Sequence, residues 1–489
     1  MIPRWPFNTT IIILAGAAVG ILLLYAIDLP QRWLASCVSA LLIAFSLAAT
    51  KNPKRILITI YFIALPVITY NFRGQLSVGH IGGPPGFFYT FLDFIFIIML
   101  TLLLGEKYIN SSIGISLTRI EKTYLMFIGI CLASVLNTYE PRLSIYELIR
   151  IFIIFIVFIY ISHNIKSKYE LNLALRAAII GLAAESVLGV FQFIQQKTLS
   201  LSLIGEPELL RPIAPGSNIL RASGTLGDPN SFSLYLGILT PIAISMLFLQ
   251  WKGQRKIYFL AVCLTAISAM IGTMSRAGWI TFIISVFMMF YLTYKSTIKY
   301  KYIKIVGIVS LAVIIAPALL FMNVIRTRAF SDDYKAAYSR VPLAKVAINT
   351  IKANPFIGVG LNNYSDVMAN YDNTPERITS RFKSVVHNTY LLIAAEIGIP
   401  GLICFLWLMF LIWKEGLELL KTTKDRYICG MAIGTLSGIS GFLLHILFEP
   451  TYLSHHVFYI LWVIIGLLIS LKKLDKANRN SLHEKYQYT

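Results

Sequence analysis

The sequence predicts an all-α membrane protein: a polytopic bundle of about 12–14 transmembrane helices, with one large extracytoplasmic loop that contains an amphipathic helix. Three observations predict this fold. Of the 489 residues, 57% are hydrophobic and only 13% are charged, whereas about 25% are charged in an ordinary soluble domain. The mean hydropathy of +0.71 is too high for a water-facing surface and requires repeated contact with lipid. Apolar runs of spanning length also recur along the chain.

The predicted spans are apolar runs bounded by charges, by proline or by glycine clusters. About 20 apolar residues cross a bilayer, and fourteen runs come close to that length or reach it. They lie near 11–27, 33–50, 55–70, 87–104, 122–136, 145–162, 172–194, 231–250, 257–274, 277–294, 302–322, 388–413, 426–447 and 456–471. The first follows Arg4 and resembles a signal sequence, but no convincing cleavage site precedes Asp28, so we interpret it as an uncleaved span.

The distribution of basic residues predicts the orientation. With an even number of spans, alternate connections face opposite sides, and cytoplasmic connections carry the excess of Lys and Arg. One set is conspicuously basic, so we expect it, together with both termini, to be cytoplasmic in an inner (plasma) membrane. Its residues are Lys51, Lys54, Arg55, Lys252, Arg255, Lys256, Lys295, Lys299, Lys301, Lys304, Lys414, Lys421, Lys424, Arg426, Lys472, Lys473, Lys476, Arg479 and Lys485.

The outward set of connections contains three long segments, of which the largest runs from Asn323 to His387. Residues 331–354 read as an amphipathic helix that ends at Asn354-Pro355. Its predicted apolar stripe is Tyr334, Tyr338, Val341, Val346 and Ile351. We divide the chain into an N-terminal transmembrane bundle (1–200), a second transmembrane region that includes the outer loop 323–387 (201–475), and a basic cytoplasmic tail (476–489).

Composition narrows the possible functions. The net charge of +20 is too dispersed for a nucleic-acid-binding patch, and the low number of acidic residues argues against a carboxylate-rich cation pump. All five cysteines fall in apolar runs without a CxxC pair, which favours buried thiols. His455 and His456 are adjacent and would point about 100° apart on a helix. We therefore expect no metal and no cofactor.

Three outward-facing segments carry unusual residues for their position. Arg221–Asn230 holds two glycines before Asp228-Pro229, a helix start that favours a nearby anion; an ordinary capped loop is the alternative. Gly272–Trp279 places Arg276 between two apolar runs, where a cation costs about 3 kcal/mol unless it snorkels outward.

The third outward-facing segment is Val385–Tyr390, which puts His387 where the long loop re-enters the membrane. A histidine titrates near neutral pH and suits a proton acceptor. A structural histidine is the alternative.

Together these segments resemble the O-antigen ligase and O-antigen polymerase superfamily. The resemblance rests on Arg276 in Ser-Arg-Ala-Gly-Trp, on Gly358-Val-Gly360 after the amphipathic helix, and on His387-Asn388 followed by Gly398-Ile-Pro-Gly401. It covers roughly residues 210–470. A count above the usual twelve or so spans is a departure from the ligases of this type.

The resemblance implies a metal-independent, inverting glycosyltransferase that moves a glycan from a polyprenyl pyrophosphate carrier to an acceptor hydroxyl of lipid A core or another glycan. Guanidinium groups suit bidentate phosphate contacts, so Arg221 and Arg276 would bind the pyrophosphate. His387 would be the catalytic base. Arg340, Asn388 and Arg381 are further candidates along the substrate path; Arg340 is included because the family often has an arginine near the start of this amphipathic helix.

Several functions stay open. A polymerase for O-antigen, capsule or exopolysaccharide uses the same donor with a different acceptor, and protein O-glycosylation is a third possibility within the enzyme class. A flippase for lipid-linked oligosaccharides would also have many spans and buried charges. It would distribute its arginines along a cavity through the membrane, whereas the three segments here belong to one side.

Overall fold

A computed structural model describes residues 52–67, 71–73, 80–109, 117–213, 217–249, 254–296, 319–329, 334–381 and 384–487, together with positions 311 and 315. Within these ranges nine helices are long and apolar enough to cross a membrane, and α4 adds a shorter apolar stretch, Phe91–Leu104. The predicted all-α polytopic bundle is confirmed. The predicted spans 11–27 and 33–50, and most of 302–322, lie outside the described residues.

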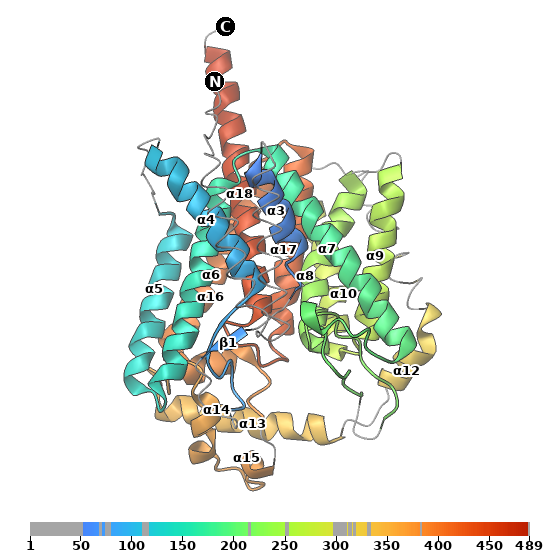
Figure 1. Cartoon of the computed structure of the whole chain (residues 1–489). Helices are drawn as coiled ribbons and strands as arrows, with labels where there is room; N and C mark the ends of the chain where they lie inside the picture. The colour runs from blue at the N-terminus through green and yellow to red at the C-terminus, as the bar shows by residue number, and fades with distance from the viewer. Residues whose placement is uncertain are drawn as a thin grey trace, which may run out of the picture.

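The bundle helices run alternately up and down (Figure 1). Along the chain they are α3 (Pro53–Ile63), α4 (Phe91–Ile109), α5 (Arg119–Ser134), α6 (Pro141–Asn164), α7 (Lys168–Gln195), α8 (Pro229–Leu249), α9 (Gln254–Gly272), α10 (Arg276–Lys295), α16 (Thr389–Thr422), α17 (Arg426–His445) and α18 (His456–Gln487). A three-residue antiparallel ribbon, β1 (Asn71–Arg73) with β2 (Phe87–Tyr89), precedes α4. Single turns of 3-10 helix are η1 (Val135–Asn137) and η2 (Ser202–Ile204).

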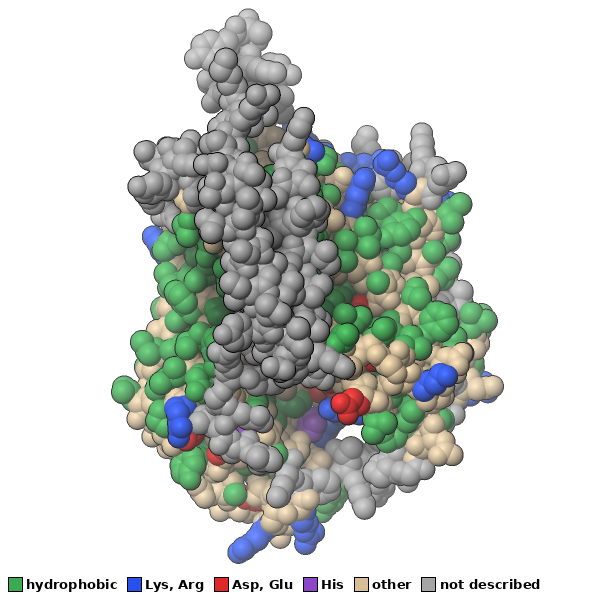
Figure 2. Space-filling view, viewed as in Figure 1, with side chains coloured by type: hydrophobic (Ala, Val, Ile, Leu, Met, Phe, Trp, Pro, Cys, Tyr) green, Lys and Arg blue, Asp and Glu red, His purple; other side chains and the backbone are tan. Residues whose placement is uncertain are grey.

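The core of the bundle lies around α8, α17 and α18, whose spanning windows are 83%, 78% and 83% buried. On both flanks of the face shown in Figure 2, hydrophobic side chains predominate at mid-height, while most charged side chains lie toward the two ends. Helices from both sides of position 200 pack together: α6 lies against α18, and α5 lies against α16. The tail predicted from residue 476 onward continues α18 as a helix to Gln487.

A layer formed by α13 and several short helices covers one end of the bundle, which we call the outer-loop end (Figure 1). It contains α12 (Met322–Ala329), α13 (Tyr334–Ala353), α14 (Tyr364–Val367), η3 (Met368–Tyr371) and α15 (Ile378–Arg381). The helix predicted before Asn354-Pro355 is confirmed as α13. Its predicted stripe was wrong for Tyr338 and Val341, which are 53% and 63% exposed. The buried face instead follows the i, i+3, i+4, i+7 spacing of Leu343, Val346, Ala347 and Thr350.

The outer loop is joined to the bundle where α16 breaks at Gly398 (φ 76°, ψ 173°). The break leaves carbonyl groups of α16 without donors from their own helix, and the outer loop supplies the donors. Val359 N–H donates to Ala395 O and Gly360 N–H donates to Glu396 O, both at 2.9 Å. A Cβ on Gly398 would lie 2.3 Å from Phe356 O. The close approach of the two backbones therefore requires glycine at this position.

Candidate functional site

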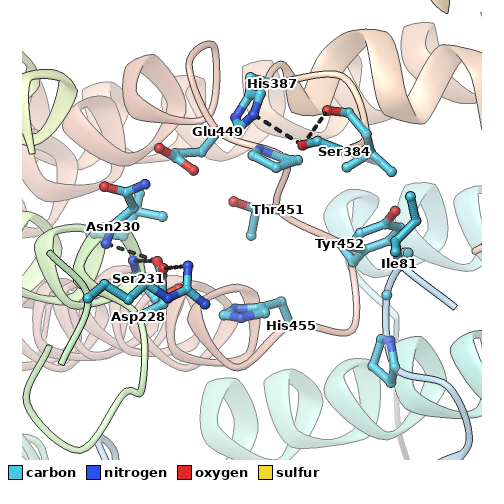
Figure 3. Close-up of a pocket in the computed structure, with 17 residues that line it drawn as sticks. Ile81, Asp228, Asn230, Ser231, Ser384, His387, Glu449, Thr451, Tyr452 and His455 are labelled. Atoms are coloured by element: carbon cyan, nitrogen blue, oxygen red, sulfur yellow. Dashed lines mark hydrogen bonds and ion pairs between the residues drawn. The ribbon is translucent and has the colours of Figure 1, made fainter. Parts of the chain in front are cut away.

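A cavity of about 480 Å³ lies at the outer-loop end. Its walls come from four connections that are far apart in the sequence: residues 81–84, the start of α8, residues 384–387, and residues 449–455 between α17 and α18. In Figure 3, Asp228, Asn230 and Ser231 form one side, Ile81 and Tyr452 the opposite side, and His387, Ser384 and Glu449 the wall between them. The cavity therefore joins the N-terminal and C-terminal halves of the chain.

The start of α8 forms the first wall. Asp228 caps the helix, because its Oδ2 accepts from the N–H groups of Asn230 at 2.9 Å and Ser231 at 3.0 Å. Its Oδ1 accepts from Arg211 NH1 at 2.7 Å. Pro229 occupies the first helical position, as the Asp-Pro pair predicted. Arg211 lines the cavity and was not among the residues selected from the sequence.

Arg221 lies directly behind this wall. Its backbone N–H donates to Arg211 O at 2.9 Å, which keeps the two arginines side by side. Its Nε donates to Thr273 O at 2.8 Å, and its NH2 donates to Asn230 Oδ1 at 2.6 Å. Asn230 and Glu449 both line the cavity. Arg221 is thus connected through Asn230 to the cavity wall.

His387 lies on the middle wall. Its Nε2 is 3.3 Å from Ser384 Oγ, and its buried Nδ1 has no hydrogen-bond partner among the described residues. Burial lowers the pKa of His387, and the Arg340 guanidinium lowers it further. The imidazole is consequently neutral near pH 7 and can accept a proton.

Glu449 is the acidic residue of the cavity. Thr389 holds the connection that carries it, because Thr389 Oγ1 donates to Glu449 O at 2.7 Å and accepts from Thr451 N–H at 2.9 Å. Burial, with the Asp228 carboxylate, raises the pKa of Glu449 to about 8, although Arg221 and Arg340 oppose the shift. Its carboxyl group is therefore mostly protonated at neutral pH.

Glu449 was missed at the level of the sequence. A signal was present, since it is the single carboxylate residue between Asp425 and Asp475, in the connection between two apolar runs. His455, already noted for its neighbour His456, also lines the cavity, and burial lowers its pKa.

The other predicted residues lie outside the cavity lining. Arg276 begins α10, and its Nε donates to Arg328 O at 3.1 Å. Asn388 caps α16, since its side chain accepts from Leu391 N–H at 3.0 Å. Arg340 is exposed on α13, near enough to shift the pKa values of His387 and Glu449. Arg381 is exposed at the end of α15.

Arg276 is nevertheless connected to the cavity wall through its turn. The carbonyl of Thr273 accepts from Arg221 Nε, and the carbonyl of Met274 accepts from Arg328 Nε at 3.0 Å. The turn of residues 273–276 therefore contains Arg276 and binds Arg221 and Arg328. Within the described residues, no three His, Cys, Asp or Glu side chains converge as a metal site.

Comparison with known proteins supports the family suggested by the motifs. No curated protein matches the chain. Residues 261–406 match a family model described as O-Antigen ligase, a stretch that runs from α9 through the outer loop and His387 into α16. Over this stretch the chain is therefore similar to the O-antigen ligase family, and its long apolar helices indicate a multi-pass membrane protein.

Proposed function

We propose that the protein transfers a glycan from a polyprenyl pyrophosphate carrier to an acceptor hydroxyl at the outer face of the inner membrane. The observation that carries this proposal is a cavity that brings a neutral histidine, His387, together with a wall that contains Arg211 and is backed by Arg221. Such a cavity can hold a phosphorylated sugar and a hydroxyl nucleophile at the same time. The cavity lies at one end of the bundle, which favours an enzyme over a flippase.

The reaction follows from these positions. The acceptor oxygen attacks the anomeric carbon, a new C–O bond forms, and the bond to the carrier pyrophosphate breaks with its electron pair leaving on phosphate oxygen. His387 Nδ1 or Nε2 takes the hydroxyl proton and later releases it to water. Attack from the side opposite the leaving group inverts the anomeric centre.

The arginines stabilise the departing pyrophosphate. Arg211 lines the cavity, Arg221 lies behind its wall, and Arg276 belongs to the turn that holds Arg221. Their positive charges stabilise the leaving group more strongly as it becomes more negative. Protonated Glu449 adds no negative charge to this site. We assign no metal to the reaction.

The test uses purified protein in lipid, carrier-linked glycan as donor and a core oligosaccharide as acceptor. We expect His387→Ala to reduce transfer by a factor on the order of 100 to 10,000, the usual contribution of a positioned general base, with donor binding retained. His163→Ala is the matched control, since His163 is a histidine paired with Glu121 at the opposite end of the bundle. Wild-type-like transfer by His387→Ala would remove His387 from the mechanism.

Two further measurements complete the test. Transfer should persist in a strong chelator, and loss that a divalent cation restores would overturn the metal-independent mechanism. In a deletion strain, accumulation of carrier-linked polymer would identify a ligase, and single repeat units would identify a polymerase.

A further inference from the structure

A short segment from the N-terminal half forms the wall opposite the arginines. We call residues 80–84 the strap. Ile81, Gly82, Gly83 and Pro84 line the cavity next to Tyr452, and Figure 3 shows Ile81 and Tyr452 across the cavity from Asp228 and Asn230. The strap residues that line the cavity carry no charge, in contrast to the arginine-backed wall. The strap also lies outside the stretch that matches the O-antigen ligase family model.

Asn362 of the outer loop clamps the strap. Its Oδ1 accepts from Gly83 N–H at 2.6 Å, and its Nδ2 donates to Pro84 O at 2.9 Å. His80 Nε2 lies 3.1 Å from the same Oδ1, and His80 Nδ1 lies 3.1 Å from Asp366 Oδ1. Burial alone would lower the pKa of His80, but the hydrogen bonds to Asp366 and Asn362 outweigh it and raise the pKa.

The clamp is itself fixed to the bundle. Two residues before Asn362, Gly360 N–H donates to the carbonyl of Glu396 at 2.9 Å, and Glu396 is a buried residue of α16 just before the break at Gly398. Asn362 is 1% exposed and adopts a positive φ of 56°, which asparagine tolerates better than most residues. A continuous path thus runs from α16 through Asn362 to the strap.

The strap has no room to approach its neighbours more closely. A Cβ on Gly82 would lie 2.5 Å from His80 Nε2, and one on Gly83 would lie 2.7 Å from Asn362 Oδ1 and 2.9 Å from the Tyr452 ring. A larger residue at either position would therefore displace a neighbouring side chain: His80 at position 82, and Asn362 or Tyr452 at position 83.

We propose that the strap and Tyr452 form the binding subsite for the acceptor sugar, and that Asn362 is the positioning residue that sets its shape. The inference rests on the proposed function. The pyrophosphate belongs with the arginines, and the attacking hydroxyl must reach His387, so the acceptor ring falls against the remaining wall. Apolar side chains and backbone groups suit a sugar, which has an apolar C–H face and a rim of hydroxyls.

Asn362→Gly is the decisive variant. It removes all three side-chain hydrogen bonds to the strap, those with His80, Gly83 and Pro84, and glycine accepts the positive φ without strain. We expect the KM for the acceptor to rise about tenfold, equivalent to about 1.4 kcal/mol, while the donor KM and the kcat at saturating acceptor change less than about twofold. Asn362→Asp keeps the acceptor for Gly83 N–H and His80, so it should recover most of the loss.

Asn349→Ala is the matched control. Asn349 also donates from the outer layer to a backbone carbonyl, Tyr371 O at 3.2 Å, but not to the strap. Its acceptor KM should stay at the wild-type value. His80→Gln is a second test should Asn362→Gly fail to accumulate, since glutamine cannot bridge Asn362 and Asp366 as the imidazole does; it too should raise the acceptor KM selectively.

Direct binding separates the two proposals. Saturation-transfer NMR would measure binding of two soluble probes, core oligosaccharide and the single repeat unit released from its carrier. Weaker probe binding by Asn362→Gly, with carrier-linked donor binding unchanged, supports the subsite. Equal binding by both proteins, or an equal loss for donor and probe, overturns it. If wild-type protein binds a probe through the strap but transfers no glycan, the proposed function fails and the subsite remains.

Discussion

Two of the titratable side chains in the cavity, His387 and Glu449, have surroundings that keep them uncharged near neutral pH. Burial and Arg340 lower the pKa of His387, whereas burial and Asp228 raise the pKa of Glu449 to about 8. A base with a lowered pKa and an acid with a raised pKa are the arrangement expected where proton transfer occurs beside an anionic substrate. Because Glu449 is uncharged near neutral pH, it does not repel the negatively charged pyrophosphate.

The charge of Glu449 predicts a pH dependence of donor binding. Below pH 8 the carboxyl group is mostly neutral; above pH 8 it becomes an anion beside the pyrophosphate and should raise the donor KM. His387 is already neutral in this window and contributes no change. We expect Glu449→Gln to keep a constant donor KM from pH 7 to pH 9, measured as transfer at fixed saturating acceptor.

The same ionisation predicts a change in stability. Between its unfolded pKa and about 8, the folded protein holds a proton that the unfolded chain releases, so stability falls as the pH rises through this window. Glu449→Gln should therefore raise the melting temperature more at pH 8.5 than at pH 5.5. Glu376→Gln, a change in the outer layer away from the cavity, should show no such difference. An alkaline rise in donor KM that persists in Glu449→Gln contradicts this assignment.

Arg211 should contribute to donor binding even though it is paired with Asp228. Its side chain is 66% exposed, and its partner Asp228 is 27% exposed; an exposed pair of this kind contributes about 0–1 kcal/mol and exchanges easily. A pyrophosphate carries more charge than Asp228 and competes for the guanidinium. We expect Arg211→Gln to raise the donor KM about tenfold in a steady-state transfer assay.

Arg142 offers a close control for Arg211. It lies at the same end of the bundle, is 65% exposed, and pairs with Glu140, which is 30% exposed. Arg142→Gln makes the same chemical change without touching the cavity and should leave the donor KM unchanged. Equal effects of the two substitutions would show that only the general surface charge matters.

At the scale of elements, the break in α16 is a specific sequence requirement. Gly398 has a positive φ and no space for a Cβ against Phe356 O. Gly398→Ala should destabilise the protein by at least 1 kcal/mol, from the positive φ and the steric conflict together. Thermal unfolding in detergent or lipid measures the effect.

Gly129 of α5 is the matched control for Gly398. A Cβ at Gly129 would meet nothing within 4 Å, so Gly129→Ala should be neutral or slightly stabilising, because alanine favours the helical interior by about 0.5–1 kcal/mol. A similar loss of stability in both variants would contradict the role assigned to the break.

The helices were predictable because each follows from a local pattern. Apolar runs between charges gave the spans, Asp228-Pro229 gave the start of α8, and Asn354-Pro355 gave the end of α13. The face that α13 buries was not predictable from a loose apolar stripe, because two of its members, Tyr338 and Val341, remain exposed. Which face is buried depends on the partner helix, α16.

The candidate site was predictable only where one segment carries its own signal. His387 lies where the outer loop meets an apolar run, and Arg221 precedes a glycine-rich helix start. Both positions therefore indicate a candidate site from the sequence alone. Asn388 attracted attention for the same reason, yet its side chain caps α16. Glu449, Arg211 and the strap enter the cavity through packing between connections up to hundreds of residues apart, and no local pattern encodes that proximity.

At the scale of the whole molecule, the stretch that matches the O-antigen ligase family model contains only part of the cavity lining. Within residues 261–406 the lining residues are Ser384, Val385 and His387. The arginine-backed wall, Glu449 and the strap lie outside it. We infer that the shared stretch supplies the proton acceptor, and that the rest of the chain adapts the cavity to particular substrates.

The orientation of the bundle predicts a simple labelling pattern. Asn373 is exposed at the outer-loop end, and Lys424 is exposed at the opposite end. Because the basic connections should face the cytoplasm, a membrane-impermeant thiol reagent applied to intact cells should label Asn373→Cys but not Lys424→Cys. The described native cysteines are buried, and Cys37→Ser removes the remaining one.

Disruption of the membrane is the control for this labelling. Lys424→Cys should become reactive once the reagent reaches the cytoplasm. Labelling of Lys424→Cys but not Asn373→Cys in intact cells would reverse the orientation and place the cavity on the cytoplasmic side.

The docking of the outer loop on α16 also limits how such chains can be recombined. The carbonyls of Ala395 and Glu396 depend on Val359 and Gly360 for their partners, and an unpartnered carbonyl within a membrane helix costs several kcal/mol. A chimera that exchanges the outer loop alone would combine the donor segment of one protein with the α16 carbonyls of another. Chimeric enzymes should therefore accumulate in the membrane only when residues 355–360 and 395–398 come from the same parent.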